Sequence, residues 1–353
     1  MNTPRENIIR TLRRDGFDSV PVDFVFCESQ IEDFKERFGH DDYRSFFGLS
    51  HRPVEIPIKK TYKNALDLYR REKLPEDVDI DEFGIGHSKG SEKAFHMTRM
   101  HHPLKGADHD EIKDYSFPVV DNSGISRFSD SVKDLHGRGL AAVGSMEMTI
   151  WEVSWYLRSM EELMIDMMTK NSNAEVLYNK ATAFACERAI AYAKAGVDIL
   201  SLGDDLGAQS APLMAVELWE EWLKPCLAKV ISAARSVNPE ILIFYHSCGY
   251  ITPFIDGLIE TGVDILNPIQ TESMDFNEIY DMAGDRVSFW GTIGTQKLLP
   301  FGSTEDVRET TISRLKKCGK NGGIVIGPTH MVEPEVPWEN LMALVETTRS
   351  FVF

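Results

Sequence analysis

The sequence has few cysteines, and they follow no pattern that would pair them. There are five, which is an odd number, they are scattered, and no CxxC motif occurs. This argues against a disulfide-stapled secreted domain and favours free thiols in a reducing compartment. No stretch approaches the roughly 18 apolar residues of a membrane span, and the first residues contain no apolar signal-peptide core. We therefore expect a soluble, cytoplasmic protein.

Positive charge is also scarce. Lysine and arginine number 38 against 55 aspartates and glutamates, so the formal net charge is −17. Such a surface repels nucleic-acid phosphates and anionic lipid, and we expect neither a nucleic-acid nor a membrane partner. A local basic pocket remains compatible with this charge.

From about residue 139 onward, apolar runs alternate with amphipathic stretches. The helix-like stretches include residues 214–237, 252–262 and 304–319. Near-continuous apolar strands separated by such helices are typical of a parallel sheet covered by helices. The apolar runs are residues 140–146, 197–203, 241–247, 263–269, 287–293 and 323–328.

These repeated units predict an α/β fold, a (β/α)8 TIM barrel with N-terminal helical and loop additions. A helix over residues 2–14 and a strand over 20–26 complete the pattern, and residues 1–353 are expected to form a single barrel domain. Residues 29–130 are rich in charge, proline, glycine and histidine, which indicates an irregular segment covering the barrel mouth. A doubly wound sheet is the alternative, but no GxGxxG follows the first strand.

Polar side chains follow each apolar run of the repeating region. In a barrel the carboxyl ends of all strands share one rim, and active sites form there. Folding alone does not require so many carboxylates, amides, imidazoles and a thiol at one edge. The residues are Glu147, Asp204, Asp205, Gln209, His246, Cys248, Gln270, Gln296 and His330.

His246 and Cys248 are the clearest candidates for metal ligands. Two residues apart on an extended segment, they point the same way and can reach one ion. Imidazole with thiolate favours zinc, and a catalytic zinc takes about three protein ligands. His330 and Glu147 are the candidates for the third ligand. A single histidine or cysteine here could instead be structural.

Other rim residues have two readings. Asp204 and Asp205 could act as catalytic acids, or could cap a helix and bind loop amides. Aromatic residues could line a pocket for an arene or could belong to the core, and core is favoured for Phe244. The candidate substrate contacts are Phe83, Gln209, Tyr245, Gln270, Trp290 and Gln296.

Long blocks of the sequence resemble the uroporphyrinogen decarboxylase superfamily, along essentially the whole chain. The resemblance implies a barrel protein, and the superfamily divides by chemistry into two branches. The blocks are RENIIRTLRRDGFDSVPVDF, DEFGIGH, HHPLKGADHDEIKDYSFP, GDDLGAQSAPLMAVELWEEWLKPCLAKVI, FYHSCGYITPFIDGLIETGVDILNPIQ, FWGTIGTQKLLPFGSTEDVRE and GPTHMVEPEVPWENL.

One branch holds the true decarboxylases, lyases that remove carboxylates from a porphyrinogen without metal or cofactor. They carry an arginine-rich segment soon after the first strand. Here that place reads VFCESQIEDFKERFG, without the expected Met-Arg-Gln-Ala-Gly-Arg run. An octacarboxylate substrate would lack its counter-charges, so this metal-independent lyase is the alternative reading.

The other branch holds the corrinoid-linked methyltransferases, whose zinc is held by a His-x-Cys pair and a later cysteine. His246 and Cys248 match the pair, and His330 stands where the later cysteine would fall. The forms GDDLGAQ and GPTH resemble members that demethylate methyl ethers, including methoxybenzoates.

This second resemblance implies an O-demethylase component. It would move a methyl group from a small methylated substrate, such as an aryl methyl ether, to the Co(I) corrinoid of a partner protein. Asp204, Asp205 or Glu147 would assist at the ether oxygen. A third reading is a non-enzymatic carrier of corrinoid or metal, against which the density of polar rim residues argues.

Overall fold

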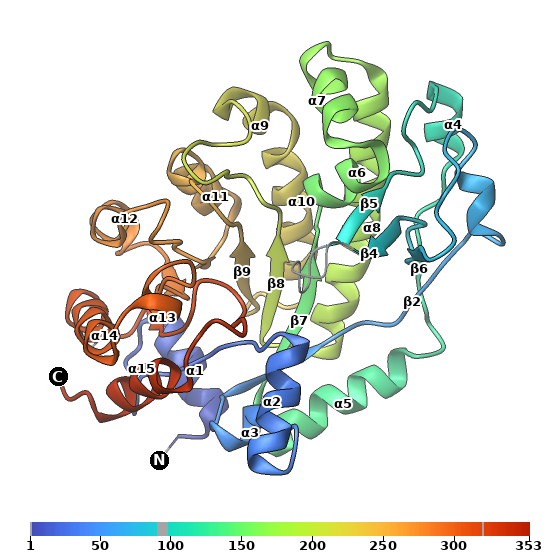
Figure 1. Cartoon of the computed structure of the whole chain (residues 1–353). Helices are drawn as coiled ribbons and strands as arrows, with labels where there is room; N and C mark the ends of the chain where they lie inside the picture. Colours follow the sequence, from blue (N-terminus) through green and yellow to red (C-terminus); the bar gives the residue numbers. More distant parts are fainter. Residues whose placement is uncertain (1, 90–97, 320) are drawn as a thin grey trace.

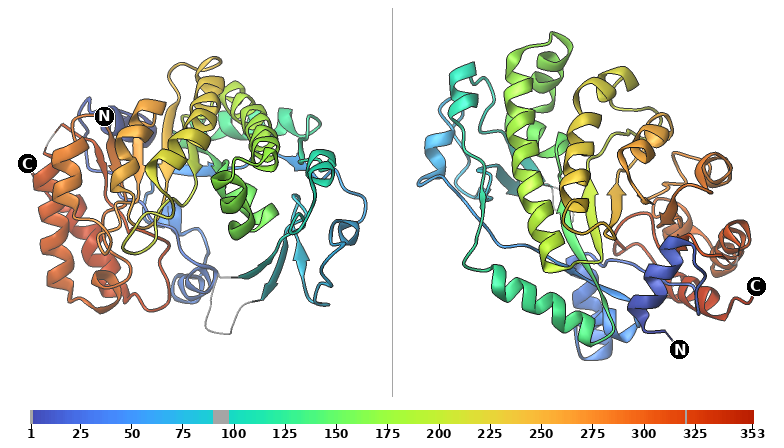
Figure 2. Two further views of the ribbon diagram at one scale, coloured as in Figure 1. Left: turned by 90° about the horizontal axis from the view of Figure 1, so that it is seen from above. Right: turned by 180° about the vertical axis from the view of Figure 1, so that it is seen from behind.

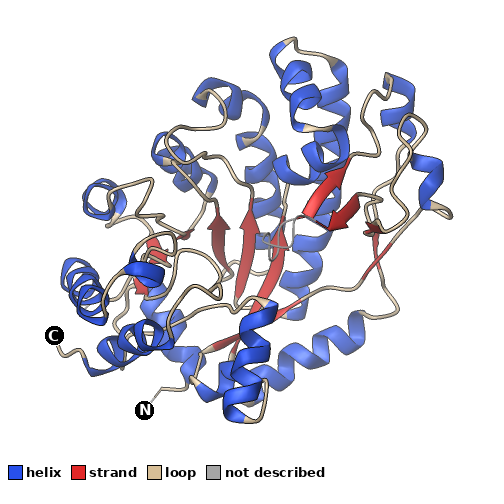
Figure 3. Cartoon of the chain, viewed as in Figure 1, coloured by secondary structure: helices blue, strands red, loops and turns tan. Residues whose placement is uncertain are grey.

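The structure is a computed structural model that describes residues 2–89, 98–319 and 321–353. Its centre, within this described part, is a curled parallel sheet of seven strands in the order β1-β7-β8-β9-β10-β11-β12 (Figures 1 and 3). These strands are β1 His51–Val54, β7 Ala141–Glu147, β8 Ile199–Gly203, β9 Leu242–His246, β10 Ile265–Asn267, β11 Ser288–Trp290 and β12 Ile324–Val325.

Residues 20–26 take the remaining strand position of the barrel. They run parallel to the last strand through the bridges Val22↔Ile326 and Phe26↔Val332. On the other side, the Asp23 carboxylate lies 3.7 Å from the His51 ring of β1. The predicted (β/α)8 fold class is confirmed, and each of the six apolar runs coincides with a strand of the sheet to within a few residues.

Helices form an arc around the outside of the sheet, as the view from above shows (Figure 2, left). The helix expected over 214–237 is two helices, because Pro225 cannot continue the hydrogen-bond ladder. The helices are α1 Pro4–Arg13, α2 Glu28–Phe38, α3 Tyr43–Phe46, α4 His109–Asp114, α5 Ile125–Gly137, α6 Trp151–Arg158, α7 Met160–Met168, α8 Ser172–Ala195, α9 Val216–Trp222, α10 Lys224–Arg235, α11 Ile255–Thr261, α12 Phe276–Ala283, α13 Leu298–Phe301, α14 Thr304–Cys318 and α15 Trp338–Ser350, with 3-10 turns at Ala65–Leu68 and Thr252–Phe254.

Side chains inside the barrel change from apolar to polar along the strands. Ile8 and Leu12 of α1 pack against inward-facing Val143 and Ile199, so α1 closes the amino-terminal end. Because strand side chains alternate, the residues two and four positions after Val143 also face inward, and they are Ser145 and Glu147. The barrel is therefore filled at one end and hollow and polar at the other.

Residues 29–130 contain more regular structure than expected. They supply β1, which joins the main sheet, and two small antiparallel sheets, β2-β6 and β3-β4-β5. Sequence reasoning missed β1 because its residues, HRPV, show no apolar run. The smaller strands are β2 Ile58–Lys59, β3 Asp79–Ile80, β4 Gly86–Lys89, β5 Thr98–His101 and β6 Val119–Val120.

The position of this segment bears on the prediction that it covers the barrel mouth. The His102 ring is hydrogen-bonded to the Tyr156 carbonyl, so the stretch after β5 packs on α6 beside the rim (Figure 1). Residues 90–97 lie outside the described residues, and the covering role stays a prediction. Within the described ranges, none of the helices has the length and apolar character needed to cross a membrane.

Candidate functional site

The turn after β9 is tied to both neighbouring strand ends. The Cys248 N–H donates to Asp205 Oδ1 at 2.7 Å, which links the turn to the residues after β8. The Gly249 N–H donates to Gln270 Oε1 at 2.8 Å, which links it to the residues after β10. Two predicted site residues therefore hold the backbone that carries the predicted thiol ligand.

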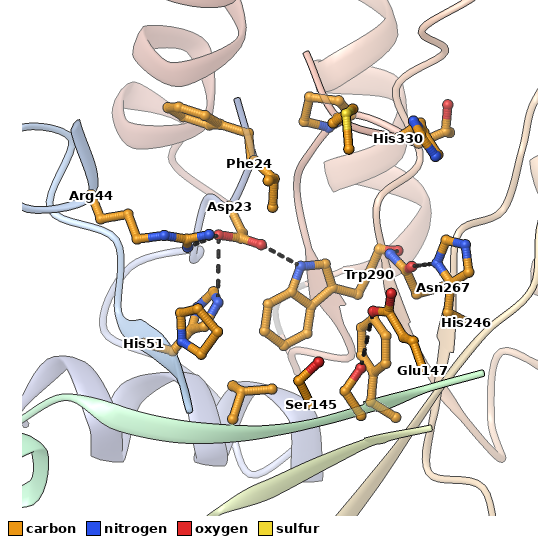
Figure 4. Close-up of a pocket in the computed structure, with 18 residues that line it drawn as sticks. Asp23, Phe24, Arg44, His51, Ser145, Glu147, His246, Asn267, Trp290 and His330 are labelled. Atoms are coloured by element: carbon orange, nitrogen blue, oxygen red, sulfur yellow. Dashed lines mark hydrogen bonds and ion pairs between the residues drawn. The ribbon is translucent and has the colours of Figure 1, made fainter. Parts of the chain in front are cut away.

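The orientation of the His246 ring is set by a chain of hydrogen bonds. Asn267 Nδ2 donates to the Trp290 carbonyl at 2.7 Å, which turns Asn267 Oδ1 toward His246. His246 Nδ1 lies 2.6 Å from this oxygen and must donate its proton to it (Figure 4). Nε2 then faces Cys248 Sγ at 3.5 Å and Asp205 Oδ1 at 3.8 Å. A histidine whose second nitrogen is held in this way is typical of metal ligands.

Asp205, His246 and Cys248 form a group in which the ligand atoms all lie within 4.8 Å of one another. Nitrogen, sulfur and oxygen donors in this set fit zinc. His330 lies beside the group, with its ring centroid 6.5 Å from that of His246, but it does not belong to the group. The structure thus brings together the predicted pair and adds Asp205, which was expected to act as an acid.

The charges around His246 favour a cation. Burial alone would lower the pKa of His246, but its hydrogen bond and electrostatic interaction with Cys248 raise this pKa well above its usual value. Glu147 and Asp205 add to this rise through their charges. These groups therefore attract positive charge at this point, whether it is a proton or a metal ion.

Asp204 does not belong to this group. It is buried, and its carboxylate accepts hydrogen bonds from the Ile150 and Glu152 N–H groups at 2.9 to 3.1 Å, where α6 begins. Burial and the nearby Glu152 raise the pKa of Asp204 well above its usual value. This geometry matches the structural reading, in which the side chain binds loop amides.

Glu152, just outside the predicted set, has an altered acidity. Burial, and then the charge of Asp205, raise the pKa of Glu152 to about 7. Its carboxylate accepts a hydrogen bond from the Tyr156 hydroxyl at 2.9 Å. Sequence reasoning passed over Glu152 because its burial depends on packing that a single sequence does not reveal.

An inner cavity of about 270 Å³ lies within the polar end of the barrel. Glu147, His246 and His330 line one end of it, and Trp290 lies between that end and Asp23 (Figure 4). Phe244 also lines the cavity. Trp290 and Phe244 pack edge to face, with ring centroids 5.4 Å apart. Phe244, for which a core position was favoured, is both buried in the barrel core and in contact with the cavity.

The far end of the inner cavity is lined by Asp23, Arg44 and His51. Sequence reasoning missed all three, because they come from three segments with no fixed spacing. The one available signal was Asp23, a carboxylate inside the apolar run VPVDFVF.

An outer cavity of about 390 Å³ shares Thr329, His330 and Met331 with the inner one. It is lined by the three predicted amides and by Cys248. Gln296 Nε2 donates to Gln209 Oε1 at 3.0 Å, so two of these amides are paired across the opening. Gln270 also lines this cavity.

The two other predicted aromatic contacts line neither cavity among the described residues. Phe83 is buried against Phe117 and Phe184. Tyr245 is 2% exposed in the core, with its hydroxyl 3.5 Å from the Asp204 carbonyl. For both, burial in the core is what the structure shows, and a role in substrate binding stays a prediction.

Comparison with known proteins identifies related sequences. The sequence model described as "Uroporphyrinogen decarboxylase (URO-D)" matches residues 101–351. The chain is 25% identical over 175 residues to a uroporphyrinogen decarboxylase of Coxiella burnetii, covering 50% of this chain and 46% of that protein. It is 25% identical over 207 residues to the enzyme of that name from a Wolbachia species, covering 57% and 55%. The chain spans about half the length of the curated relatives that it matches.

One solved structure is similar over almost its full length. A methyltransferase from Methanosarcina mazei superposes with a TM-score of 0.69 at 19% identity, covering 99% of this chain and 98% of that one. At this identity the likeness shows a shared fold.

Proposed function

The chain belongs to the uroporphyrinogen decarboxylase family, and from this premise we propose that it is a zinc-dependent methyltransferase. Its substrate would be a small methylated compound, most simply an aryl methyl ether such as a methoxybenzoate. Its methyl acceptor would be the Co(I) corrinoid of a partner protein. The observation that carries the proposal is the Asp205, His246 and Cys248 group, in which Asn267 directs the His246 Nε2 lone pair toward the other two donors.

One set of residues would bind the metal ion, and another set would bind the substrate. His246, Cys248 and Asp205 would be ligands, with His330 and Glu147 as the further candidates. Zinc, when bound, would supply a Lewis acid to the ether oxygen, and the corrinoid would supply the cobalt that takes the methyl group. The rings of Phe244 and Trp290 would hold the arene in line with that methyl carbon.

Glu147 is the acid best situated for the ether oxygen. It lines the inner cavity beside His246, whereas the Asp204 carboxylate is occupied by backbone N–H groups. Phenolate is a poor leaving group unless its charge is stabilised, so a metal and an acid at the same end of the cavity would assist its departure.

The alternative is a metal-independent decarboxylase, which is what the similar proteins of Coxiella burnetii and Wolbachia are called. The cavities argue against it. Arg44 is the one arginine or lysine among the described residues that line them. An inner space of about 270 Å³ lies just below the usual volume of ligand pockets, which is roughly 300–1,000 Å³. A porphyrinogen with eight carboxylates needs more room and more positive charge.

Metal analysis combined with methyl transfer tests the proposal. Purified protein should contain about one zinc per chain. Mixed with Co(I) cobalamin and a panel of methoxyarenes, thiols and methylamines, it should produce methylcobalamin absorbance with at least one substrate. Cys248→Ala should lose zinc and transfer, while Cys186→Ala, a free cysteine outside the group, should keep both. No cobalt methylation with any panel member would refute the proposal, and turnover of uroporphyrinogen would establish the alternative.

A further inference from the structure

The Arg44 end of the inner cavity holds polar atoms without partners. Asp23 Oδ2 accepts a hydrogen bond from Trp290 Nε1 at 3.0 Å. Its other oxygen, Oδ1, lies 3.7 Å from both Arg44 Nη1 and His51 Nε2, too far for a hydrogen bond. Asp23 Oδ1, Arg44 Nη1 and His51 Nδ1 are all buried and have no hydrogen-bond partner among the described residues.

Such a cluster requires an explanation, because buried polar groups in folded proteins are nearly always paired. The side chains of Asp23 and His51 are at least nine-tenths buried, and both line the cavity with Arg44 (Figure 4). The cluster contains one hydrogen-bond acceptor, one donor and one imidazole that can do either. A single ligand oxygen that both donates and accepts could serve Asp23 Oδ1 and Arg44 Nη1, which lie 3.7 Å apart, while His51 lines the same end of the cavity.

Charge selects among the groups that could supply this oxygen. The formal charges of Asp23 and Arg44 cancel, and burial lowers the pKa of His51, which favours its neutral form. A carboxylate placed here would be buried beside Asp23 with no net counter-charge, which is costly. A hydroxyl adds no charge, donates to Asp23 Oδ1 and accepts from Arg44 Nη1. The local electrostatics therefore favour a hydroxyl.

We propose that Asp23 and Arg44, with the neutral His51 ring beside them, bind the phenolic hydroxyl of the substrate, which makes a hydroxylated aryl methyl ether, rather than a methoxybenzoate, the preferred ligand class. The arene would lie against Phe244 and Trp290, and the methoxy group would reach the end of the cavity that holds Glu147 and His246. This inference rests on the proposed function for the identity of the methoxy group, but not for the recognition of the hydroxyl.

Calorimetric titration with three ligands of similar size tests the preference directly, without any corrinoid. Wild-type protein should bind 4-methoxyphenol roughly tenfold or more tightly than anisole, because a hydrogen bond to a charged group is gained. It should bind 4-methoxybenzoate no more tightly than anisole. The pair 4-ethylphenol and ethylbenzene should repeat the preference without an ether oxygen. Equal binding of phenols and their parent arenes, or tighter binding of the benzoate, would overturn the inference.

The variant Asp23→Asn should reverse the order in which the protein binds the phenol and the benzoate. Without its counter-ion, Arg44 should recruit an anion, so 4-methoxybenzoate should gain roughly tenfold in affinity while 4-methoxyphenol loses several-fold. A loss of packing alone would weaken all ligands together, and that outcome would count against the subsite.

Asp33→Asn is the matched control. Asp33 also accepts a tryptophan Nε1–H, from Trp338, and also pairs with an arginine, Arg37, but it lies on α2 outside the cavity. This variant should leave the order of the three ligands unchanged. If Asp23→Asn does not fold, the wild-type series still decides. If the protein prefers phenols but transfers no methyl group to Co(I), the subsite is supported and the proposed function is refuted. If it transfers methyl groups but does not prefer phenols, the proposed function is supported and the subsite is refuted.

Discussion

His246 is the residue whose chemistry depends most on a neighbour. Asn267 Oδ1 accepts its Nδ1 proton, which leaves the Nε2 lone pair toward Cys248 and Asp205. Asn267→Ala should free the ring to turn and should weaken metal affinity about 10- to 100-fold, the usual effect of losing such a partner. Competition with a chromogenic chelator measures this affinity. Asn277→Ala, at an exposed position of α12, is the control and should match wild type.

Glu152 makes stability depend on pH. Its pKa is raised from 4.5 to about 7, first by burial and then by the charge of Asp205. Between these values the folded protein keeps a proton that the unfolded chain releases. Stability is therefore lost as the pH rises through this window, and it is constant above it. Glu152→Gln, which still accepts from Tyr156, should raise the free energy of unfolding at pH 8 by about 1–3 kcal/mol and leave it unchanged at pH 4.

Urea denaturation of chelator-treated protein across pH 4 to 8 checks this expectation. Exposed Glu161→Gln should track wild type at every pH. If Glu152→Gln raises the free energy of unfolding by the same amount at pH 4 and at pH 8, the ionisation of Glu152 is not the cause of the increase.

The limits of sequence reasoning are clear at Asp204 and Asp205. Both residues follow the end of a strand. The direction of each carboxylate depends on the residue at which the extended backbone ends, and a single sequence does not give that residue. In the structure Asp204 binds the start of α6, and Asp205 joins His246 and Cys248. The His246 and Cys248 pair was predictable because spacing of two fixes a shared face whatever the rest of the fold. Asp23, Arg44 and His51 share no such spacing.

At the scale of elements, the turn after β9 depends on glycine. Gly249 has φ +79°, and a Cβ there would lie 2.4 Å from the Gly207 carbonyl oxygen. Gly249→Ala should cost about 2–4 kcal/mol, the sum of left-handed strain and overlap, and should also reduce metal content by displacing Cys248. Gly196→Ala is the control, since Gly196 has φ +85° with nothing within 4 Å. It should cost only about 1 kcal/mol and keep the metal. Melting curves with metal analysis separate the two effects.

The elements found from sequence and those missed differ in composition. Each of the six apolar runs after residue 139 coincides with a strand to within a few residues, because strands buried on both faces need apolar residues along most of their length. β1 was not predicted, because its residues HRPV include a charged residue and a proline. Its place in the sheet depends on pairing with β7. β1 carries His51 into the inner cavity, so the element that was missed also carried a functional candidate that was missed.

At the scale of the whole molecule, a metal at the group of Asp205, His246 and Cys248 would join the ends of β8 and β9. An ion that binds only the folded state stabilises it by about 4 kcal/mol at a thousandfold excess over its Kd. Removing metal with a chelator should therefore lower the melting temperature of wild type measurably, and added zinc should restore it. Chelation should leave Cys248→Ala unchanged, whereas Cys186→Ala should respond as wild type does.

This thermal comparison also separates the two candidate functions without needing a substrate. A metal-independent decarboxylase gives no reason for stability to depend on zinc, so identical melting with and without chelator in wild type would count against the methyltransferase. If chelation lowers the melting temperature of wild type but not that of Cys248→Ala, the ion that stabilises the protein binds to the Cys248 thiol at the carboxyl rim of the barrel. Because chelation could also strip adventitious surface ions, the shift must saturate at about one zinc per chain to support the site, and a shift that keeps growing beyond that ratio would refute it.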